Sequence, residues 1–319
     1  MADRGNAHSA FLTIIEGCDK NCSYCVVPFT RGPERSRTSA SVLDEAKRIA
    51  ATGTPEITLL GQTVNSYRDP SPAGRTFAQL LDEVGQVEGL RRVRFTTSHP
   101  RDFGPDIVDA IDRNPKLCNW VHLPVQSGST SVLKGMRRSY SRDQYLRVID
   151  YIKAASREIA LSTDIIVGFP GETQEDFEET LSLLQEIEYA QVYSFKYSPR
   201  RGTDSVDYGD HIPEDEKSRR LKVLQEMQQR IQARRNAERV GDEEEAFVEG
   251  YRKKHDQWIG RTSESRVLNF SDPNQLAAGS DLRGSYCHVK VNKGGPNSLV
   301  GQLTSIAARP VGPAFQILQ

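Results

Sequence analysis

The chain has 319 residues, of which 37% are hydrophobic and 27% charged, and its net charge at pH 7 is −1. This composition excludes an intrinsically disordered chain and suits one large domain followed by a small one. No apolar run is long enough to span a bilayer, and no hydrophobic N-terminal segment marks a signal peptide, so we expect a cytoplasmic protein without membrane contact. Five cysteines in such a chain favour a reducing compartment over disulfides.

The first motif is a cysteine loop directly after an apolar run, residues 10–15, which we predict to be a buried strand. Cys18, Cys22 and Cys25 have the spacing Cys-x3-Cys-x2-Cys, which can turn three thiolates toward one point. Thiolates suit an iron–sulfur cluster or zinc. A 4Fe–4S cluster held by three cysteines keeps one iron open to a substrate, whereas zinc would want a fourth ligand nearby. We favour the cluster and keep as the alternative a structural zinc in a non-catalytic RNA-binding module.

Apolar strands and amphipathic helices then alternate along the chain. The further predicted strands cover residues 56–60, 92–97, 121–125, 161–167 and 191–197. The predicted helices cover residues 41–51, 76–87, 105–114, 141–155 and 174–188. Ser41 is the predicted N-terminal cap of the first of these helices. Six β–α alternations predict a parallel sheet that is closed or partly closed as a barrel. All six strands end in polar or Gly-rich segments, which is where such folds place their chemistry.

The C-terminal third has a different character. Beyond Pro213, Leu224, Met227 and Ile231 fall at helical spacing in a long basic segment, which we predict to be a helix packed on the barrel. Apolar and polar residues then alternate in residues 246–249, 266–270, 286–291 and 299–305, which predicts a small antiparallel β-barrel. The predicted organisation is a linker over 1–9, a barrel over 10–212, a basic connecting helix over 213–240 and the small barrel over 241–319.

Several of these motifs together resemble the methylthiotransferases of the radical S-adenosylmethionine (SAM) superfamily. The resemblance rests on residues 16–25, 30–32 with 36–37, 59–67, 122–129, 164–173 and 260–262 with 266–270. The last of these motifs is similar to the TRAM domain, a small RNA-binding barrel. The resemblance implies an α/β fold, a partial (β/α)6 TIM-like radical SAM barrel followed by a small all-β TRAM barrel.

The resemblance also implies an activity. The expected enzyme adds a methylthio group to carbon 2 of N(6)-isopentenyladenosine at position 37 of tRNA, with the anticodon stem-loop as its partner. Alternatives within the family act on threonylcarbamoyladenosine in tRNA or on a ribosomal protein. The cofactors are one 4Fe–4S cluster with an open iron, which cleaves SAM to a 5′-deoxyadenosyl radical, and SAM itself. We further expect an electron donor such as flavodoxin or ferredoxin, and a monomer.

The family carries a second, auxiliary 4Fe–4S cluster in a further N-terminal domain, where it supplies sulfur. This sequence has no second cysteine triplet. We therefore expect the second cluster only in the intact enzyme, and we expect this chain to be a truncated form capable of SAM binding and cleavage only.

The resemblance assigns roles to individual residues. Cys18, Cys22 and Cys25 are the predicted catalytic, metal-ligating residues. The predicted SAM contacts are Tyr24, Gln62, Asn65, Thr97, Gln126, Arg138 and Asp164. Of these, Arg138 suits the SAM carboxylate or is a solvated cation, whereas Gln126 and Asp164 suit the ribose hydroxyls. Gln62 and Asn65 either bind the amino end of SAM or cap the next turn.

Two groups of cations are the predicted RNA contacts, because phosphate contacts position a nucleic acid while an extruded base reaches the pocket. They are Arg31, Arg35 and Arg37 beside the cysteine loop, and Lys253, Lys254, Arg261 and Arg266 in the small barrel. His99, His122, His255, Cys118 and Cys287 show no ligand spacing, and we predict that they are structural.

Overall fold

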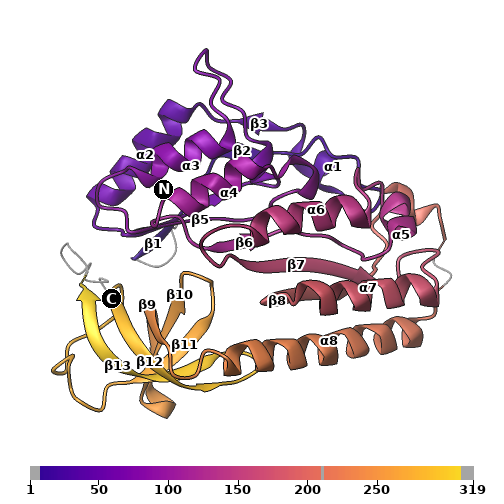
Figure 1. Cartoon of the computed structure of the whole chain (residues 1–319). Helices are drawn as coiled ribbons and strands as arrows, with labels where there is room; N and C mark the ends of the chain where they lie inside the picture. Colours follow the sequence, from indigo (N-terminus) through magenta and orange to yellow (C-terminus); the bar gives the residue numbers. More distant parts are fainter. Residues whose placement is uncertain (1–7, 210–211, 310–319) are drawn as a thin grey trace.

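The computed structural model describes residues 8–209 and 212–309. Most of the predicted linker, residues 1–7, lies outside the described residues, as do 210–211 and the end of the predicted small barrel, 310–319. In chain order, Figure 1 shows a curved layer of strands covered by helices, one long helix and a small β-barrel.

Six parallel strands form the inner layer of the first part. They are β1 (Ser9–Thr13), β4 (Glu56–Leu60), β5 (Arg92–Phe95), β6 (Trp120–His122), β7 (Ala160–Val167) and β8 (Gln191–Lys196), in two sheets ordered β1-β4-β5 and β6-β7-β8. The Val93 N–H donates to the Lys116 carbonyl over 2.8 Å, and the Cys118 N–H to the Val93 carbonyl over 3.0 Å, so residues 116–118 join the sheets. The predicted α/β class with parallel strands in chain order is confirmed.

Helices cover the outer face of these strands (Figure 1). They are α2 (Ser39–Ala51), α3 (Phe77–Gly85), α4 (Pro105–Arg113), α5 (Thr130–Gly135), α6 (Arg142–Lys153) and α7 (Gln174–Ile187). The strands β1 and β4–β8 with these helices are called the half-barrel below. Within residues 8–209, β1 pairs only with β4 and β8 only with β7, so the half-barrel is open between β1 and β8.

Local sequence explains most helix ends. Thr76, Ser141 and Thr173 each begin a helix with a reciprocal capping box. The cap predicted at Ser41 is wrong, because α2 begins two residues earlier. Thr38 is its N-cap, and the Thr38 hydroxyl accepts from the Ser41 backbone N–H over 3.3 Å.

Short elements near the cysteine loop were not predicted. They are β2 (Ile15–Glu16), β3 (Arg35–Ser36), α1 (Val27–Arg31) and the 3-10 turns η1 (Val64–Ser66), η2 (Pro100–Asp102) and η3 (Asp204–Val206). Each is too short to carry a hydrophobic period, which is why the sequence pattern gives no sign of it.

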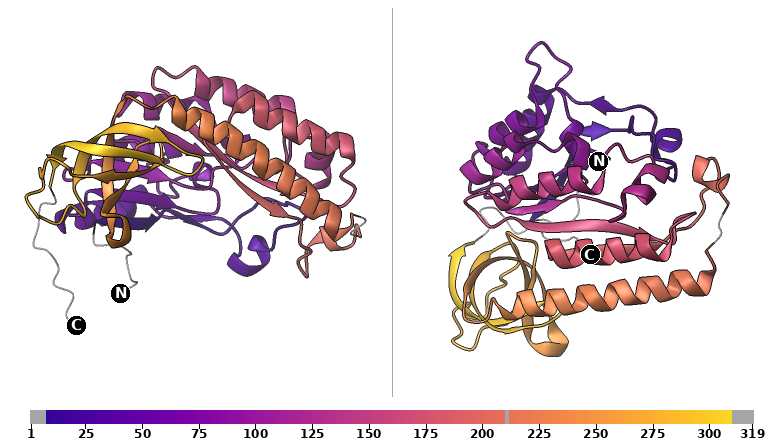
Figure 2. Two further views of the ribbon diagram at one scale, coloured as in Figure 1. Left: turned by 90° about the horizontal axis from the view of Figure 1, so that it is seen from below. Right: turned by 45° about the vertical axis from the view of Figure 1, so that its right-hand side comes forward.

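The long helix α8 (Glu214–Ala237) runs along the half-barrel and ends at the small barrel (Figures 1 and 2). Leu224 and Ile231 are buried and Met227 packs against the same core, as the helical spacing predicts. Gln228 and Gln232 donate to the carbonyls of Tyr189 and Ala190, both over 2.8 Å, which fixes α8 beside β8. Much of the helix's positive charge is used inside the protein, as in the ion pairs of Arg220 with Glu172 and Glu216 and of Arg235 with Glu158.

Five strands close the small barrel in the order β10-β11-β13-β12-β9. They are β9 (Glu243–Arg252), β10 (Gln257–Thr262), β11 (Val267–Ser271), β12 (Tyr286–Gly294) and β13 (Leu299–Ala308), with the turn η4 (Lys253–His255) between β9 and β10. The barrel interior includes Val248, Leu268, Phe270, Val289 and Leu303. Two corrections follow: β10 was missed in the sequence, and β11 and β13 pair parallel rather than antiparallel.

The small barrel docks at the amino ends of β4 and β5 through two arginines. Arg94 donates to the carbonyls of Thr262 and Ser263 over 2.8 and 3.1 Å, and it ion-pairs with Glu56 over 3.2 Å. Arg92 donates to the Arg261 carbonyl over 2.8 Å. The end of β10 and the loop after it therefore cover the amino ends of the half-barrel strands, which are called the lower end below. No helix in the described ranges 8–209 and 212–309 is long and apolar enough to cross a membrane.

Candidate metal and cofactor site

A pocket of about 350 Å³, called the cysteine pocket below, lies at the carboxyl ends of the half-barrel strands. Its lining includes Cys18, Lys20, Cys22, Tyr24, Cys25, Gln62, Thr97, His99, Pro124, Gln126, Arg138 and Asp164. The fold thus brings all three predicted cysteine ligands together with six of the seven predicted SAM contacts. They come from segments as far apart as residue 18, in the cysteine loop, and residue 164, in β7, which the parallel order of the strands brings together.

The cysteine loop is shaped by one glycine and held by backbone contacts. Gly17 has φ +76°, and a Cβ there would lie 2.1 Å from the Pro33 carbonyl oxygen, so the turn requires glycine. The Cys18 N–H donates to the Gly32 carbonyl over 3.2 Å. Ser23 fastens the loop to α5, donating through its N–H to the Met136 carbonyl over 3.0 Å and through its hydroxyl to the Gly135 carbonyl over 2.9 Å.

The three thiols are free, and the surroundings of Cys18 and Cys25 disfavour bare thiolates. Burial raises the pKa of Cys18 and of Cys25, and the neighbouring thiols add to the rise. A cationic metal centre would reverse this preference, because it stabilises coordinated thiolates. Within residues 8–209 and 212–309, no three His, Cys, Asp or Glu side chains lie close enough to hold a single ion. The fit to a metal centre therefore rests on the shared pocket and on thiolate chemistry.

Arg138 lies in the pocket beside the cysteines. Its Nη1 is 3.3 Å from Cys22 Sγ, its Nε donates to the Tyr140 hydroxyl over 2.9 Å, and its Nη2 donates to the Pro124 carbonyl over 3.1 Å. Burial opposes the charge, but Tyr140, Tyr24 and Cys22 outweigh it and raise the Arg138 pKa further. A fixed guanidinium in this position suits a carboxylate ligand. Of the two alternatives for Arg138, the geometry favours the ligand-binding one.

Gln62 gives a second observation that points to a ligand. Its Oε1 is buried and has no hydrogen-bond partner within residues 8–209 and 212–309, although Gln62 lines the pocket. A buried acceptor without a partner is costly, and a donor such as an amino group would satisfy it. Thiolates, a guanidinium and this free acceptor together fit a 4Fe–4S cluster with SAM.

Asn65 corrects one expectation. Its Nδ2 donates to the His99 carbonyl over 2.8 Å, and its Oδ1 accepts from the His99 N–H over 2.7 Å. Both polar groups of the buried amide are therefore occupied, and Asn65 does not line the pocket. It holds the start of η2 in place instead of contacting the cofactor.

Two strand ends over the pocket carry left-handed backbone in residues other than glycine. Thr97 has φ +65° and Gln126 has φ +75°. Each is held by its neighbours: the Thr97 carbonyl accepts from the Val64 N–H over 3.1 Å, and the Gln126 N–H donates to the Asp164 carbonyl over 2.9 Å. Conformations of this kind cost free energy and gather at functional sites.

Asp164 has a partner that the sequence did not predict. Its Oδ1 lies 3.4 Å from His122 Nε2, and His122 Nδ1 is 3.0 Å from the Ser162 hydroxyl. Two further pocket residues were not predicted as ligands. Lys20 ion-pairs with Asp102 over 2.5 Å, and burial together with the Arg138 charge lowers the pKa of His99 to about 3, so His99 is neutral. The only sequence signal for them is their place in a strand-end loop.

The predicted RNA contacts beside the cysteine loop divide into two kinds. Arg31 and Arg35 are exposed at the surface. Arg37 is occupied within the protein, because its Nη1 donates to the Thr13 carbonyl over 2.9 Å and to Glu45 over 2.8 Å.

The predicted contacts in the small barrel divide in the same way. Lys253 and Lys254 are exposed on the turn η4. Arg261 pairs with Glu249 over 2.8 Å and stays partly exposed. The Arg266 side chain is only 7% exposed and pairs with Glu264 over 2.7 Å. Since α1 and the small barrel lie at opposite ends of the half-barrel in Figure 1, the seven cations do not form one patch.

Comparisons with known proteins agree with this geometry. The model of the radical SAM superfamily matches residues 12–184. A tRNA-2-methylthio-N(6)-dimethylallyladenosine synthase from Solibacter usitatus is 59% identical over 303 residues, covering 95% of this chain and 68% of the relative. A synthase of the same name from Koribacter versatilis is 54% identical, covering 94% and 67%. The chain thus spans about two thirds of the length of these curated relatives.

Solved structures show the same fold at low identity. The radical SAM methyltransferase TsrM from Kitasatospora setae, with tryptophan substrate and the SAM analogue aza-SAM bound, has a TM-score of 0.50 and 21% identity, covering 60% of this chain and 36% of that one. Coproporphyrinogen III oxidase HemN from Escherichia coli, a radical SAM enzyme, has a TM-score of 0.50 and 15% identity, covering 70% and 52%.

Proposed function

The chain belongs to the radical SAM superfamily and, within it, to the family of tRNA-2-methylthio-N(6)-dimethylallyladenosine synthases, and we propose that it binds and cleaves SAM for methylthio transfer to tRNA. One observation carries the proposal: Cys18, Cys22 and Cys25 share a pocket with the Arg138 guanidinium and the free acceptor of Gln62.

Each pocket residue has a task in this proposal. The three cysteines would ligate a 4Fe–4S cluster, with one iron open. Arg138 would hold the SAM carboxylate and Gln62 the amino group, leaving Gln126 and Asp164 for the ribose hydroxyls. When bound, the cluster and SAM supply one-electron chemistry and a carbon radical that acid–base groups cannot provide. The protein's own part is to hold these groups and to exclude water around them.

The RNA part of the proposal rests on the relatives' name and on exposed cations. That name specifies dimethylallyladenosine in tRNA, which favours carbon 2 of this base over the threonylcarbamoyl and ribosomal-protein alternatives. The closed small barrel would act as a TRAM-like RNA-binding module, with Lys253 and Lys254 on its exposed turn and Arg31 and Arg35 beside the pocket. A cytoplasmic monomer, a flavodoxin- or ferredoxin-like electron donor and a second cluster in the intact enzyme complete the proposal.

The test begins with anaerobic reconstitution of the chain. We expect a brown protein with about four irons that forms 5′-deoxyadenosine from SAM and dithionite. Cys22→Ala should lose the irons and the activity. Cys118→Ala is the matched control, because Cys118 is a buried cysteine outside the pocket, and it should keep both. A colourless protein with one tightly bound zinc and no SAM cleavage would contradict the proposal and favour the non-catalytic RNA-binding alternative.

A further inference from the structure

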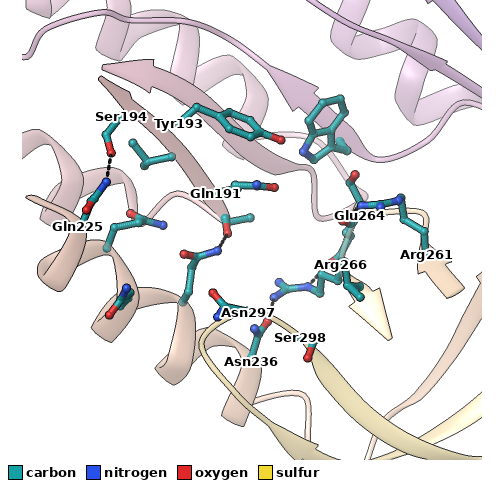
Figure 3. Close-up of a pocket in the computed structure, with 18 of the residues that line it drawn as sticks. Gln191, Tyr193, Ser194, Gln225, Asn236, Arg261, Glu264, Arg266, Asn297 and Ser298 are labelled. Atoms are coloured by element: carbon teal, nitrogen blue, oxygen red, sulfur yellow. Dashed lines mark hydrogen bonds and ion pairs between the residues drawn. The ribbon is translucent and has the colours of Figure 1, made fainter. Parts of the chain in front are cut away.

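A second cavity, called the edge groove below, lies between β8, α8 and the small barrel. Its volume is about 740 Å³, and its lining includes Trp120, Tyr193, Gln225, Gln228, Arg261 and Asn297. Figure 3 shows Gln191 and Tyr193 on one side of the groove and Arg261 and Arg266 on the other. Side-chain amides and guanidinium groups supply both donors and acceptors here, and the charge is mixed, since Glu264 also lines the groove.

Exposed aromatic rings stand along the strand that borders this groove. Tyr193 and Phe195 are 41% and 53% exposed. They are two residues apart on β8, so they face the same side of the sheet. Because β8 is an edge strand at the open side of the half-barrel, no neighbouring strand within the described ranges covers them. Both rings are therefore accessible to a partner on the same face of one strand.

The Tyr193 ring forms a cluster with two further aromatic rings on β6. Its ring meets His122 edge-on at 5.7 Å, and His122 stacks on Trp120 at 6.0 Å with an interplanar angle of 13°. Ser162 and Asp164 hold the two His122 nitrogens, and Asp164 itself lines the cysteine pocket. His122 therefore links the Tyr193 ring in the edge groove to Asp164 in the cysteine pocket.

The surroundings of the Tyr193 hydroxyl agree with this position. Burial raises its pKa, the Arg261 charge lowers it and the Asp164 charge raises it. The side chain therefore lies within electrostatic reach of Arg261 in the edge groove and of Asp164 in the cysteine pocket.

We propose that Tyr193, backed by His122 and Trp120, is the platform on which the target adenine of the RNA substrate stacks as it enters the half-barrel. The inference rests on the proposed function and assigns it a substrate-positioning residue. A planar heteroaromatic base matches the exposed ring face, and its polar edge matches the amides and Arg261 of the edge groove. Stacking is indifferent to ring substituents, which leaves room for an alkylated adenine.

The experiment compares two RNA hairpins by fluorescence anisotropy. One carries N(6)-dimethylallyladenosine in its loop, and the other has an abasic site at that position. The reconstituted wild-type chain should bind the first on the order of ten-fold more tightly. Tyr193→Ala should remove the preference and Tyr193→Phe should keep it. Tyr151→Ala, which alters an exposed tyrosine on the outer helix α6, is the matched control and should behave as wild type.

A spectroscopic readout separates stacking from folding defects. The chain has two tryptophans, so Trp258→Phe makes Trp120 the sole reporter. The base-bearing hairpin should quench or shift its emission more than the abasic hairpin does. If the wild type cleaves SAM and binds hairpins equally with and without the base, the platform is overturned while the proposed function stands. If it neither cleaves SAM nor binds either hairpin, both fail.

Discussion

The two ends of the half-barrel differ in whether their buried polar groups have hydrogen-bond partners. The amino ends of the strands form the lower end, and the carboxyl ends, with the cysteine pocket, form the upper end. At the amino ends of the strands, Arg92 and Arg94 are buried, and each guanidinium donates to carbonyl groups of the small barrel. At the carboxyl ends, Gln62 Oε1 has no partner among the residues that the structure describes. The buried Cys18 and the partly buried Cys25, both with raised pKa values, face the cysteine pocket there. Thr97 and Gln126, both with left-handed backbone, also lie at this second end.

This difference indicates that the lower end serves the stability of the fold and the upper end serves ligand binding. Buried charges stabilise a fold only when their partners are complete, whereas incomplete partners mark a place that a ligand fills. The lower end is not perfectly satisfied, since Glu56 Oε2 lacks a partner in the described part of the chain, but the other Glu56 oxygen accepts from Arg94 over 3.2 Å. The lower end thus fixes the small barrel, and the upper end carries the residues of the proposed cofactor site.

The largest effect on stability is expected at the lower end. Arg94→Leu should destabilise the chain by about 3–5 kcal/mol, because it removes two bonds to the small barrel and leaves Glu56 buried without its cation. Urea unfolding of the metal-free chain measures it. The double variant Glu56→Leu with Arg94→Leu should recover part of the loss, since no lone charge remains. A loss below about 1 kcal/mol in the single variant would refute the assigned role.

A smaller effect, on binding, is expected at the upper end. Arg138→Gln should weaken SAM binding to the reconstituted protein by about 10- to 100-fold, the range for a hydrogen bond to a charged group. Arg137→Gln is the matched control: Arg137 is exposed and pairs with Asp204 outside the pocket. Equilibrium dialysis with labelled SAM gives both values. Equal affinities in the two variants would argue against a carboxylate contact at Arg138.

That pair of arginines also marks what the sequence can and cannot decide. The strand order and the gathering of strand ends follow from hydrophobic periodicity, which is why the pocket is predictable from loops far apart in the chain. Periodicity does not predict which of the two adjacent arginines, Arg137 or Arg138, enters the pocket, because both have the same chemistry. The left-handed backbone of Arg137, with φ +54°, turns its side chain toward Asp204.

Other failures have comparable physical causes. Gln62 and Asn65 belong to one motif, but Asn65 is occupied by the His99 backbone, a contact 34 residues away that no local pattern reveals. Arg266 looks like a surface cation and is instead buried against Glu264 and Asn236. β10 was missed because Trp258, Ile259 and Gly260 follow one another without alternation, and a bulge interrupts the strand there.

His99 adds a pH dependence at the upper end. Burial and Arg138 lower its pKa to about 3, whereas an unfolded histidine titrates near ~6.5. The unfolded chain therefore binds a proton first as the pH falls, and stability is lost from about pH 6.5 downward. Between pH 7 and 5.5 the protonation of His99 in the unfolded chain lowers the free energy of unfolding by about 1 kcal/mol. His99→Gln should remove that part of the pH dependence, measured by urea unfolding at several pH values, and an unchanged slope in this variant would contradict the prediction.

The smallest effect is expected for an ion pair on the surface. Arg113 and Asp82 are 2.9 Å apart, but their side chains are 61% and 39% exposed. Asp82→Asn should change the free energy of unfolding by less than about 0.5 kcal/mol, since solvent screens exposed pairs and ordering two side chains costs entropy. Urea unfolding at low and high salt measures the change. A loss comparable to that of Arg94→Leu would mean that burial does not separate the two pairs, and the contrast between the lower end of the half-barrel and its surface would then fail.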